Sequence, residues 1–317
     1  MWQSKQFTSL KEEIEAVLTC INNTDSLYRI IGDGIERAGL KCLRSSNQPW
    51  CLLPLAICEG ICGRCDQAIP VAAALYFYRV AADIFDDIED QDSSDSLSAI
   101  YGDPIAVNAA TTLLILAQKA INRSVDKGIP AETILHLTEV VNGYYINACR
   151  GQHLDLASYE KGVLSEEEYM DITGKKSATT AQCACHAGAL IGNAKSRLVE
   201  VLTLFGYNLG MGFQIADDID GVVHGSDIKT HKITLPVIYA LTTTEGNDKK
   251  VLNQAYIEHE ESPLKTSQIK DMLFRTGAIQ YTILRMESYR QCAIDILRKA
   301  EQEGFNSQRL KPFLEIR

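Results

Sequence analysis

Two clusters of aspartates could do chemistry in this sequence, and each follows a long apolar stretch. The first comprises Asp83, Asp86, Asp87 and Asp90, after an almost uncharged stretch over residues 70–82. Because residues three and four apart share a face of a helix, these carboxylates would form one stripe. Like charges on a stripe repel each other unless the stripe faces water or binds a cation. The first cluster therefore predicts either a solvated helix end or a cation site at the mouth of an apolar helix.

The second cluster repeats this pattern later in the chain. Asp217, Asp218 and Asp220 follow another apolar stretch, and Gln214 lies about one helical turn before Asp217. Two acidic helix ends of this kind favour a cation site over a solvated end. Facing one another, they would form an oxygen-rich cage suited to Mg²⁺, which prefers carboxylates, waters and phosphate oxygens. The ligand implied is a polyphosphate group on an apolar body.

The elements that must position these clusters are all predicted to be helices. Apolar residues recur at helical spacing, and no convincing alternating strand, repeat or low-complexity linker is found. Residues 91–103 are predicted as a polar loop, with Asp103 as the N-cap of the next helix. We expect one all-α domain over residues 1–317, a large helical bundle with a central apolar cavity. The expected helices are about 5–22, 25–38, 51–64, 69–90, 104–127, 131–157, 196–223, 247–258, 266–275 and 277–303, with others beginning at a capping box, Ser165 to Glu168, and at Thr234.

Composition and charge exclude several classes of function. The chain has 317 residues, of which 46% are hydrophobic and 23% charged, as in ordinary globular proteins. Its formal net charge of -10 argues against nucleic-acid binding, which needs a basic surplus. No run of about 18 apolar residues is present, so no membrane-spanning helix is expected. The first residues lack the apolar core of a signal peptide, which makes the cytoplasm the expected location.

The ten cysteines are mostly expected to be small buried hydrophobic residues. Cys58, Cys62 and Cys65 form a local pattern of thiols, and Cys51 is one more candidate ligand. A zinc or iron–sulfur site is conceivable there. However, the segment reads as a helix and no second pair of closely spaced cysteines occurs, so a metal–thiolate site is the minor alternative.

Taken together, the motifs over about residues 70–240 resemble those of the trans-isoprenyl diphosphate synthases, also called polyprenyl synthetases. That family has two aspartate motifs, a GQxxDL element, a Lys–Thr pair and a DxxxxKxTLP tail. A lone DDxxD motif would be weak support, but five elements in the family's order and at roughly its spacing are specific. The matching segments are Asp86–Asp90, Gly151–Leu156, Lys175–Ser177, Phe213–Asp218 and Asp227–Pro236.

The resemblance implies an allylic prenyl diphosphate substrate and Mg²⁺, with about three ions once diphosphate is bound. The metals and lysines would stabilise the leaving diphosphate while an apolar cavity keeps water from the allylic cation. The implied metal ligands are Asp86, Asp87, Asp90, Asp217, Asp218 and Asp220. The residues implied to bind the diphosphate are Gln152, Lys175, Gln214, Lys229 and Lys232. The implied catalytic residues are Asp86, Asp87, Lys176, Asp217 and Asp218.

Three departures from the family pattern concern the second substrate, isopentenyl diphosphate, and the metal. An early GGKxxRP element survives only as the spacing of Lys41 and Arg44, and the RRG element after the first motif is missing, because no arginine occurs between Asp90 and Arg123. The third aspartate of the second motif is replaced by Gly221, and Asp220 is a candidate substitute. Losing charge-assisted contacts, each worth about 1.5–3 kcal/mol, disfavours condensation with isopentenyl diphosphate.

The preferred hypothesis is therefore a prenyltransferase that passes the cation to another acceptor, such as a peptide or an aromatic ring. The chain is similar here to a divergent branch that includes bacterial enzymes prenylating a tryptophan of a pheromone precursor. The alternative is a terpene synthase that cyclises the same diphosphate, and the second alternative is a chain-elongating synthase. A non-catalytic subunit is disfavoured because both aspartate motifs are retained.

Chain length and oligomeric state are further expectations carried by the resemblance. The residues that would form the cavity floor, Ala81 and Ala82, are small, whereas Tyr78 and Phe77 lie about one turn deeper. Because these two aromatic residues could close the cavity below an open floor, a substrate of about fifteen to twenty carbons is expected. The resemblance also implies a homodimer.

Overall fold

The structure is a computed structural model that describes residues 2–45, 50–90, 95–158, 162, 164–257 and 266–316. Within helix α2, the side chains from residue 38 onward lie outside this description, which includes Lys41 and Arg44. All regular secondary structure in the described residues is helical, so the predicted all-α fold is confirmed. The central apolar cavity stays a prediction.

The chain divides into two compact units. Unit 1 comprises Met1–Asn142, Cys183–Leu202 and Ala300–Pro312, and unit 2 comprises Gly143–Gln182, Thr203–Lys299 and Phe313–Arg317. Several long helices contribute residues to both units. The expectation of a single domain over residues 1–317 also stays a prediction.

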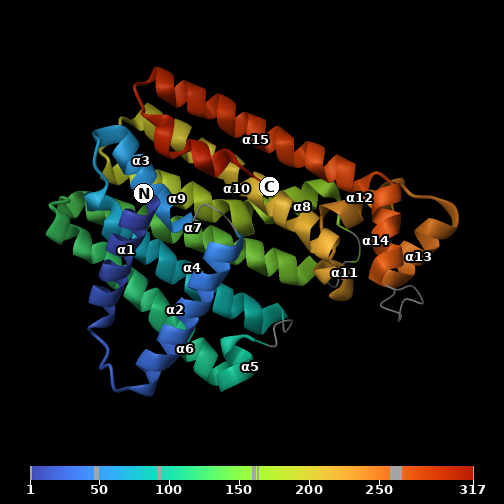
Figure 1. Cartoon of the computed structure of the whole chain (residues 1–317), viewed down its shortest axis with the longest axis horizontal. Helices are drawn as coiled ribbons and strands as arrows, with labels where there is room; N and C mark the ends of the chain where they lie inside the picture. The colour runs from blue at the N-terminus through green and yellow to red at the C-terminus, as the bar shows by residue number, and fades with distance from the viewer. Residues whose placement is uncertain are drawn as a thin grey trace. The chain divides into compact units, whose positions relative to one another are not determined.

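Unit 1 is built around α4, the apolar helix that ends in the first aspartate cluster. Most of its residues from Ile69 to Ile84 are buried, and it packs chiefly against α6, which runs beside it in Figure 1. Its last turn is only half-buried, so the carboxylates emerge where the apolar part ends. The helices that begin in unit 1 are α1 (Trp2–Leu18), α2 (Ser26–Ser45), α3 (Leu53–Cys62), α4 (Ile69–Asp90), α5 (Leu97–Tyr101), α6 (Asp103–Asn122), α7 (Ala131–Ser158) and, after α9, α10 (Ser196–His224), with 3-10 turns at Trp50–Leu52, Asp66–Ala68 and Arg123–Lys127.

Unit 2 has its own apolar core, formed by residues of α10 to α15 from Val222 to Ile279. Helix α12 packs against α8, α13 and α14, and the short α11 packs against α14. The elements that begin in unit 2 are α8 (Glu166–Thr173), a π-helical turn (Gly174–Ala178), α9 (Thr179–Ile191), α11 (Ser226–Lys229), α12 (Leu235–Thr243), α13 (Gly246–Tyr256), α14 (Thr266–Arg275) and α15 (Ala278–Gln302). Two 3-10 turns, Ser307–Arg309 and Lys311–Leu314, follow α15.

Most predicted helix bounds agree with the structure to within a few residues. Helix α2 is an exception, because it continues to Ser45 and the predicted end near residue 38 was wrong. The capping box is present, because Ser165 Oγ accepts from Glu168 N at 3.2 Å while the Glu168 carboxylate accepts from Ser165 N. The predicted polar loop over 91–103 was wrong in part, since it contains α5, which Ser96 caps by accepting from Ala99 N at 3.0 Å. Asp103 is the first residue of α6 rather than its N-cap, a shift of one position that is common at helix ends.

Among the described residues, three helical stretches are long and apolar enough to cross a membrane by length and composition alone. They are Asp66–Asp90, Asp103–Lys127 and Ser196–His224, and 78%, 44% and 56% of their most apolar windows are buried inside the fold. The apolar character of Asp66–Asp90 is therefore used largely for packing within unit 1. The absence of a membrane-spanning helix stays a prediction.

The cysteine cluster near the end of α3 contains two buried thiols, Cys58 and Cys65, and one exposed thiol, Cys62. The sulfurs of Cys58 and Cys62 lie 3.8 Å apart. Burial raises the pKa of the Cys58 thiol far above its usual range and that of Cys65 to about 12, which keeps both protonated. In the part of the chain that the structure describes, no group of three or more His, Cys, Asp or Glu residues could hold a metal ion by itself. Cys58 and Cys65 therefore fit the expected role of buried packing residues, whereas the exposed Cys62 does not.

Candidate active site

The first aspartate motif occupies the last turn of α4 in unit 1. Asp86, Asp87 and Asp90 are half-buried, and Asp86 and Asp90 share a helical face because they are four residues apart. Asp83 differs from them, since its Oδ1 lies 2.6 Å from Arg79 Nε one turn earlier. The arginine compensates the charge of Asp83, which sets this carboxylate apart from the three of the DDxxD motif.

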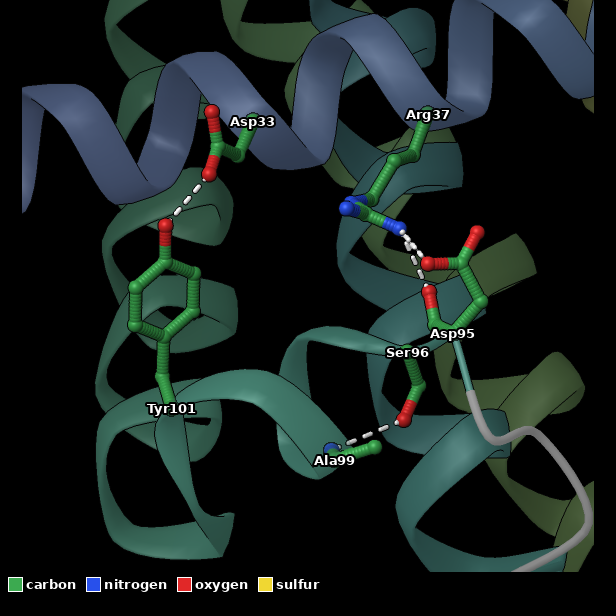
Figure 2. Close-up of polar contacts among 6 residues, drawn as sticks. All are labelled: Asp33, Arg37, Asp95, Ser96, Ala99 and Tyr101. Atoms are coloured by element: carbon green, nitrogen blue, oxygen red, sulfur yellow. Dashed lines mark hydrogen bonds and ion pairs between the residues drawn. The ribbon is translucent and has the colours of Figure 1, made fainter.

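Helix α2 binds Asp95 and Tyr101, which follow this motif in the chain (Figure 2). Arg37 Nη1 donates to the Asp95 carboxylate at 2.7 Å and to the Asp95 carbonyl oxygen at 2.6 Å. One turn away on α2, Asp33 accepts from the hydroxyl of Tyr101. Hydrogen bonding to Asp95 raises the pKa of Arg37. Arg37 of α2 is thus already paired with an acidic residue that follows the first motif.

The second aspartate motif lies on α10 in unit 2, and its best-defined member is Asp218. The side chain is only 4% exposed. It accepts hydrogen bonds from three elements: the Tyr169 hydroxyl of α8, Gln214 Nε2 at 3.2 Å, and the backbone N–H of Leu235 at 3.4 Å. Asp217 and Asp220 are exposed. The structure thus brings Gln214 and Asp218 together and leaves the other two carboxylates of the cluster at the surface of unit 2.

Burial is the main influence on the charge of Asp218. It raises the pKa of Asp218 to about 7, and the charge of Asp227 acts in the same direction. The hydrogen bonds from Tyr169 and Gln214 partly oppose this by stabilising the ionised form. Burial, followed by the charge of Asp218, raises the pKa of Tyr169 well above its usual range, so its hydroxyl stays protonated and donates. A nearby cation would favour the ionised form of Asp218.

The predicted lysine pair lies in the π-helical turn Gly174–Ala178, a local widening often found at functional sites. Lys176 Nζ lies 2.7 Å from Asp155 Oδ2 of α7, and Lys175 pairs with Asp171 one turn earlier. Gln152 is half-buried and precedes Asp155 by three residues, so the two share a face of α7. The structure therefore brings Lys176 next to the turn of α7 that carries Gln152.

This approach of α7 to the π-helical turn requires a glycine at position 151. A Cβ added to Gly151 would lie 2.3 Å from Lys176 N and 2.7 Å from Lys175 C, and both contacts are with backbone. Gly151→Ala is therefore expected to destabilise the chain by about 1–3 kcal/mol, because the two backbones must separate. Urea unfolding measures this change.

A matched control lies in the same helix. No atom comes within 4 Å of a Cβ added to Gly143, which also belongs to α7. Gly143→Ala is expected to stabilise the chain by up to about 1 kcal/mol through helix propensity. Equal stability of the Gly151→Ala variant and the wild type would contradict the close approach.

The remaining predicted residues, Lys229 and Lys232, flank a turn after α11. Lys229 is exposed and Lys232 is half-buried. Between them, His231 adopts a left-handed backbone conformation with φ of 54°, which is uncommon for a residue with a side chain. The His231 ring nitrogen Nδ1 lies 2.8 Å from the carbonyl oxygen of Ala255, so the turn is fastened to α13.

Sequence reasoning missed the partners of these residues. Asp155, Tyr169 and Asp171 each pair with a predicted site residue, yet none was assigned a role. Asp155 stands inside the GQxxDL element and could have been included. Tyr169 had no such signal, because an aromatic residue after a capping box is most often part of a core.

Comparison with known proteins gives a consistent result. The profile of the polyprenyl synthetase family matches residues 50–273. The chain is 28% identical over 255 residues to a geranylgeranyl diphosphate synthase of Sulfolobus acidocaldarius, covering 76% of this chain and 77% of that one. It is 30% identical over 257 residues to a short chain isoprenyl diphosphate synthase of Methanothermobacter thermautotrophicus, covering 77% and 75%.

A solved structure shares the fold. The crystal structure of geranylgeranyl pyrophosphate synthase from Corynebacterium glutamicum, complexed with isoprenyl diphosphate and magnesium, has a TM-score of 0.79 and 18% identity, covering 99% of this chain and 98% of that one. At this identity the likeness concerns the fold. The match of the family profile to more than half of the chain is the stronger finding. The chain therefore belongs to the polyprenyl synthetase family.

Proposed function

We propose that this protein ionises an allylic prenyl diphosphate with the help of Mg²⁺ and passes the cation to an acceptor other than isopentenyl diphosphate. The observation that supports ionisation most directly is Asp218, a buried carboxylate that accepts hydrogen bonds from three separate elements. Burying a carboxylate is costly, and such groups are concentrated at functional sites. The second aspartate motif is thus built around a group that a cation would ionise.

The donor set suits Mg²⁺. All predicted ligands, Asp86, Asp87, Asp90, Asp217, Asp218 and Asp220, are carboxylates, which this hard cation prefers. In the described residues no three such groups could hold an ion unaided. Mg²⁺ commonly takes one or two carboxylates and completes its shell with waters and substrate phosphates. The residues therefore fit an ion that binds together with diphosphate.

In this proposal the lysines and amides bind the diphosphate. When bound, Mg²⁺ would neutralise negative charge on the leaving diphosphate. Positive charge and N–H donors come from Lys176, Lys175, Lys229 and Lys232. The neutral amides of Gln152 and Gln214 add further N–H donors. Asp155 holds Lys176 with its amine 2.7 Å away, which keeps the flexible side chain in one orientation. The number of magnesium ions stays a prediction.

The fate of the cation is inferred from the segment after the first motif. Where the family has arginines for isopentenyl diphosphate, this chain has acidic and small polar residues. Asp95 also pairs with Arg37, so a second diphosphate there would meet a carboxylate and an arginine that is already engaged. The other two candidate contacts, Lys41 and Arg44, have side chains outside the described residues. An aromatic or peptide acceptor needs no second anion site.

Chain elongation is the second candidate, and the names of the relatives favour it. Two of them are named geranylgeranyl and short chain isoprenyl diphosphate synthase. A substrate of about fifteen to twenty carbons is consistent with small residues at the expected cavity floor, followed by Tyr78 one turn deeper. The Tyr78 hydroxyl is held by Gln118 and Asn142, so this side chain is a rigid candidate for the end of the cavity. The homodimer and the cytoplasmic location stay predictions.

Product analysis separates these candidates. The purified chain is incubated with Mg²⁺ and geranyl, farnesyl or geranylgeranyl diphosphate, each with and without isopentenyl diphosphate. We expect diphosphate release at a rate that isopentenyl diphosphate leaves unchanged, with simple prenyl alcohols while the acceptor is missing. Longer prenyl diphosphates would replace the proposal with chain elongation, and hydrocarbons from one substrate would replace it with cyclisation. No release from any allylic diphosphate would overturn ionisation itself.

A further inference from the structure

Position 221 on α10 is the one place where the second aspartate motif has lost a carboxylate. Gly221 stands there, and the short helix α11 follows after Gly225. We propose that Asp227 of α11 supplies the missing carboxylate and acts on the magnesium that this motif binds. The proposal rests on the proposed function, and it adds a residue that none of the sequence motifs assigns to the metal.

The geometry at Gly221 carries the proposal. A Cβ added to Gly221 would lie 2.2 Å from Asp227 Oδ2, 2.4 Å from Oδ1 and 2.3 Å from Cγ. Such distances are far too short for coexisting atoms. The carboxylate of Asp227 therefore fills the space in which an aspartate side chain at position 221 would begin. In this chain the aspartate that begins the DxxxxKxTLP tail, on α11, thus occupies the space of a side chain at position 221.

The register of α10 places this carboxylate beside the rest of the motif. Gly221 is four residues after Asp217 and three after Asp218, so all three positions share a face of the helix. The negative charge of Asp227 also raises the pKa of the Asp218 carboxyl group. Asp227 is half-buried, whereas Asp220 is exposed. Asp227 is thus a carboxylate held against the same face as Asp217 and Asp218.

Local hydrogen bonds fix α11 against α10. Gly225, with φ of 78°, makes the tight turn between the two helices. Ser226 Oγ donates to the Gly221 carbonyl oxygen at 3.2 Å, and Lys232 N donates to the Asp227 carbonyl oxygen at 2.9 Å. These bonds use backbone groups of Asp227 and Gly221. The Ser226 hydroxyl also lies 3.3 Å from Asp227 Oδ1, and the amide oxygen of Asp227→Asn can accept the same hydrogen bond.

Metal binding can be measured without any turnover. The full chain is titrated with Mn²⁺ in the presence of inorganic diphosphate, and free Mn²⁺ is followed by electron paramagnetic resonance. We expect Asp227→Asn to weaken Mn²⁺ binding about tenfold, the usual cost of losing a group that supports a metal ligand shell. Asp271→Asn, which removes an exposed carboxylate of α14, is the charge-matched control and should bind as the wild type does.

A relocation experiment tests the stand-in role directly. In Gly221→Asp/Asp227→Ala the carboxylate returns to the motif's own position, in the space that the alanine vacates. Gly221→Asn/Asp227→Ala has the same volume without the charge. We expect the aspartate version to bind Mn²⁺ about tenfold more tightly than the asparagine version and within about threefold of the wild type. This pair remains informative if Asp227→Asn alone fails to fold.

The outcomes are distinguishable. Equal Mn²⁺ affinity of folded Asp227→Asn and wild type, or of the two relocation variants, would overturn the role of Asp227 alone. A wild-type chain that binds neither Mn²⁺ nor diphosphate would overturn the proposed function. Thermal unfolding of each variant shows whether a loss of affinity reflects a loss of fold.

Discussion

Asp86→Asn should slow the release of diphosphate from an allylic prenyl diphosphate by about 10²–10³-fold. Asp86 is the first carboxylate of the motif that ends α4, and it shares a helical face with Asp90. Asparagine keeps the size of the side chain but removes the negative charge that binds Mg²⁺. Without the metal, the charge that develops on the leaving diphosphate is not neutralised. The rate is measured as diphosphate released under saturating substrate.

A matched control lies one turn earlier on the same helix. Asp83 pairs with Arg79 at 2.6 Å and is therefore not assigned to the metal. Asp83→Asn should keep the rate within about threefold of the wild type and lose less than about 1 kcal/mol of stability, as for other partly exposed ion pairs. Comparable rates for Asp86→Asn and the wild type would refute the role of the first motif.

The helices could be predicted from sequence because their signals are local. α4 and α14 have the predicted bounds, Ile69–Asp90 and Thr266–Arg275, and the capping box at Ser165 is read from four residues. Helix α5 was not predicted within the polar segment after Asp90, because a helix of five residues with one cap shows too little hydrophobic periodicity. The division into two units had no sequence signal, because long helices such as α7 and α10 run through both.

The partners of the site residues could not be predicted, because they are distant in sequence. Tyr169 and Asp218 are 49 residues apart, and Arg37 and Asp95 are 58 apart. A sequence motif gives the order of residue types along the chain. It does not show which distant side chains contact them in the folded protein. Asp227 illustrates this: it was recognised as the start of a tail motif, whereas its contact with Gly221 depends on the turn at Gly225.

The metal-free protein should lose stability as the pH rises from about 4 to about 7, and Asp218 should be a main cause. Burial raises the pKa of Asp218 from 3.8 to about 7. Between these values the folded chain keeps a proton that the unfolded chain has released. Since the folded state binds more protons, the contribution of Asp218 to the free energy of unfolding falls with rising pH, by on the order of 4 kcal/mol across this window, and is constant above it.

Asp218→Asn should remove this contribution. The amide oxygen can still accept from the Tyr169 hydroxyl, and the Gln214 amide can turn to accept from the new NH₂ group. We expect the variant to be more stable than the wild type at pH 8 by about 2–4 kcal/mol and about equal to it near pH 4. Urea unfolding at both pH values, with EDTA present, measures the difference. Asp271→Asn on the surface of α14 controls for the loss of one charge.

Two further measurements link this pH dependence to the site. Tyr169→Phe removes a donor that stabilises the ionised carboxylate, so it should raise the pKa of Asp218 further and extend the window of falling stability to higher pH.

Mg²⁺ with inorganic diphosphate should stabilise the wild type at pH 8 but not Asp218→Asn, because only the ionised carboxylate binds the ion. If the stability difference between Asp218→Asn and the wild type were the same at pH 4 and pH 8, Asp218 would not be the buried titrating group. If Mg²⁺ and diphosphate stabilised both equally, this carboxylate would not belong to the metal site.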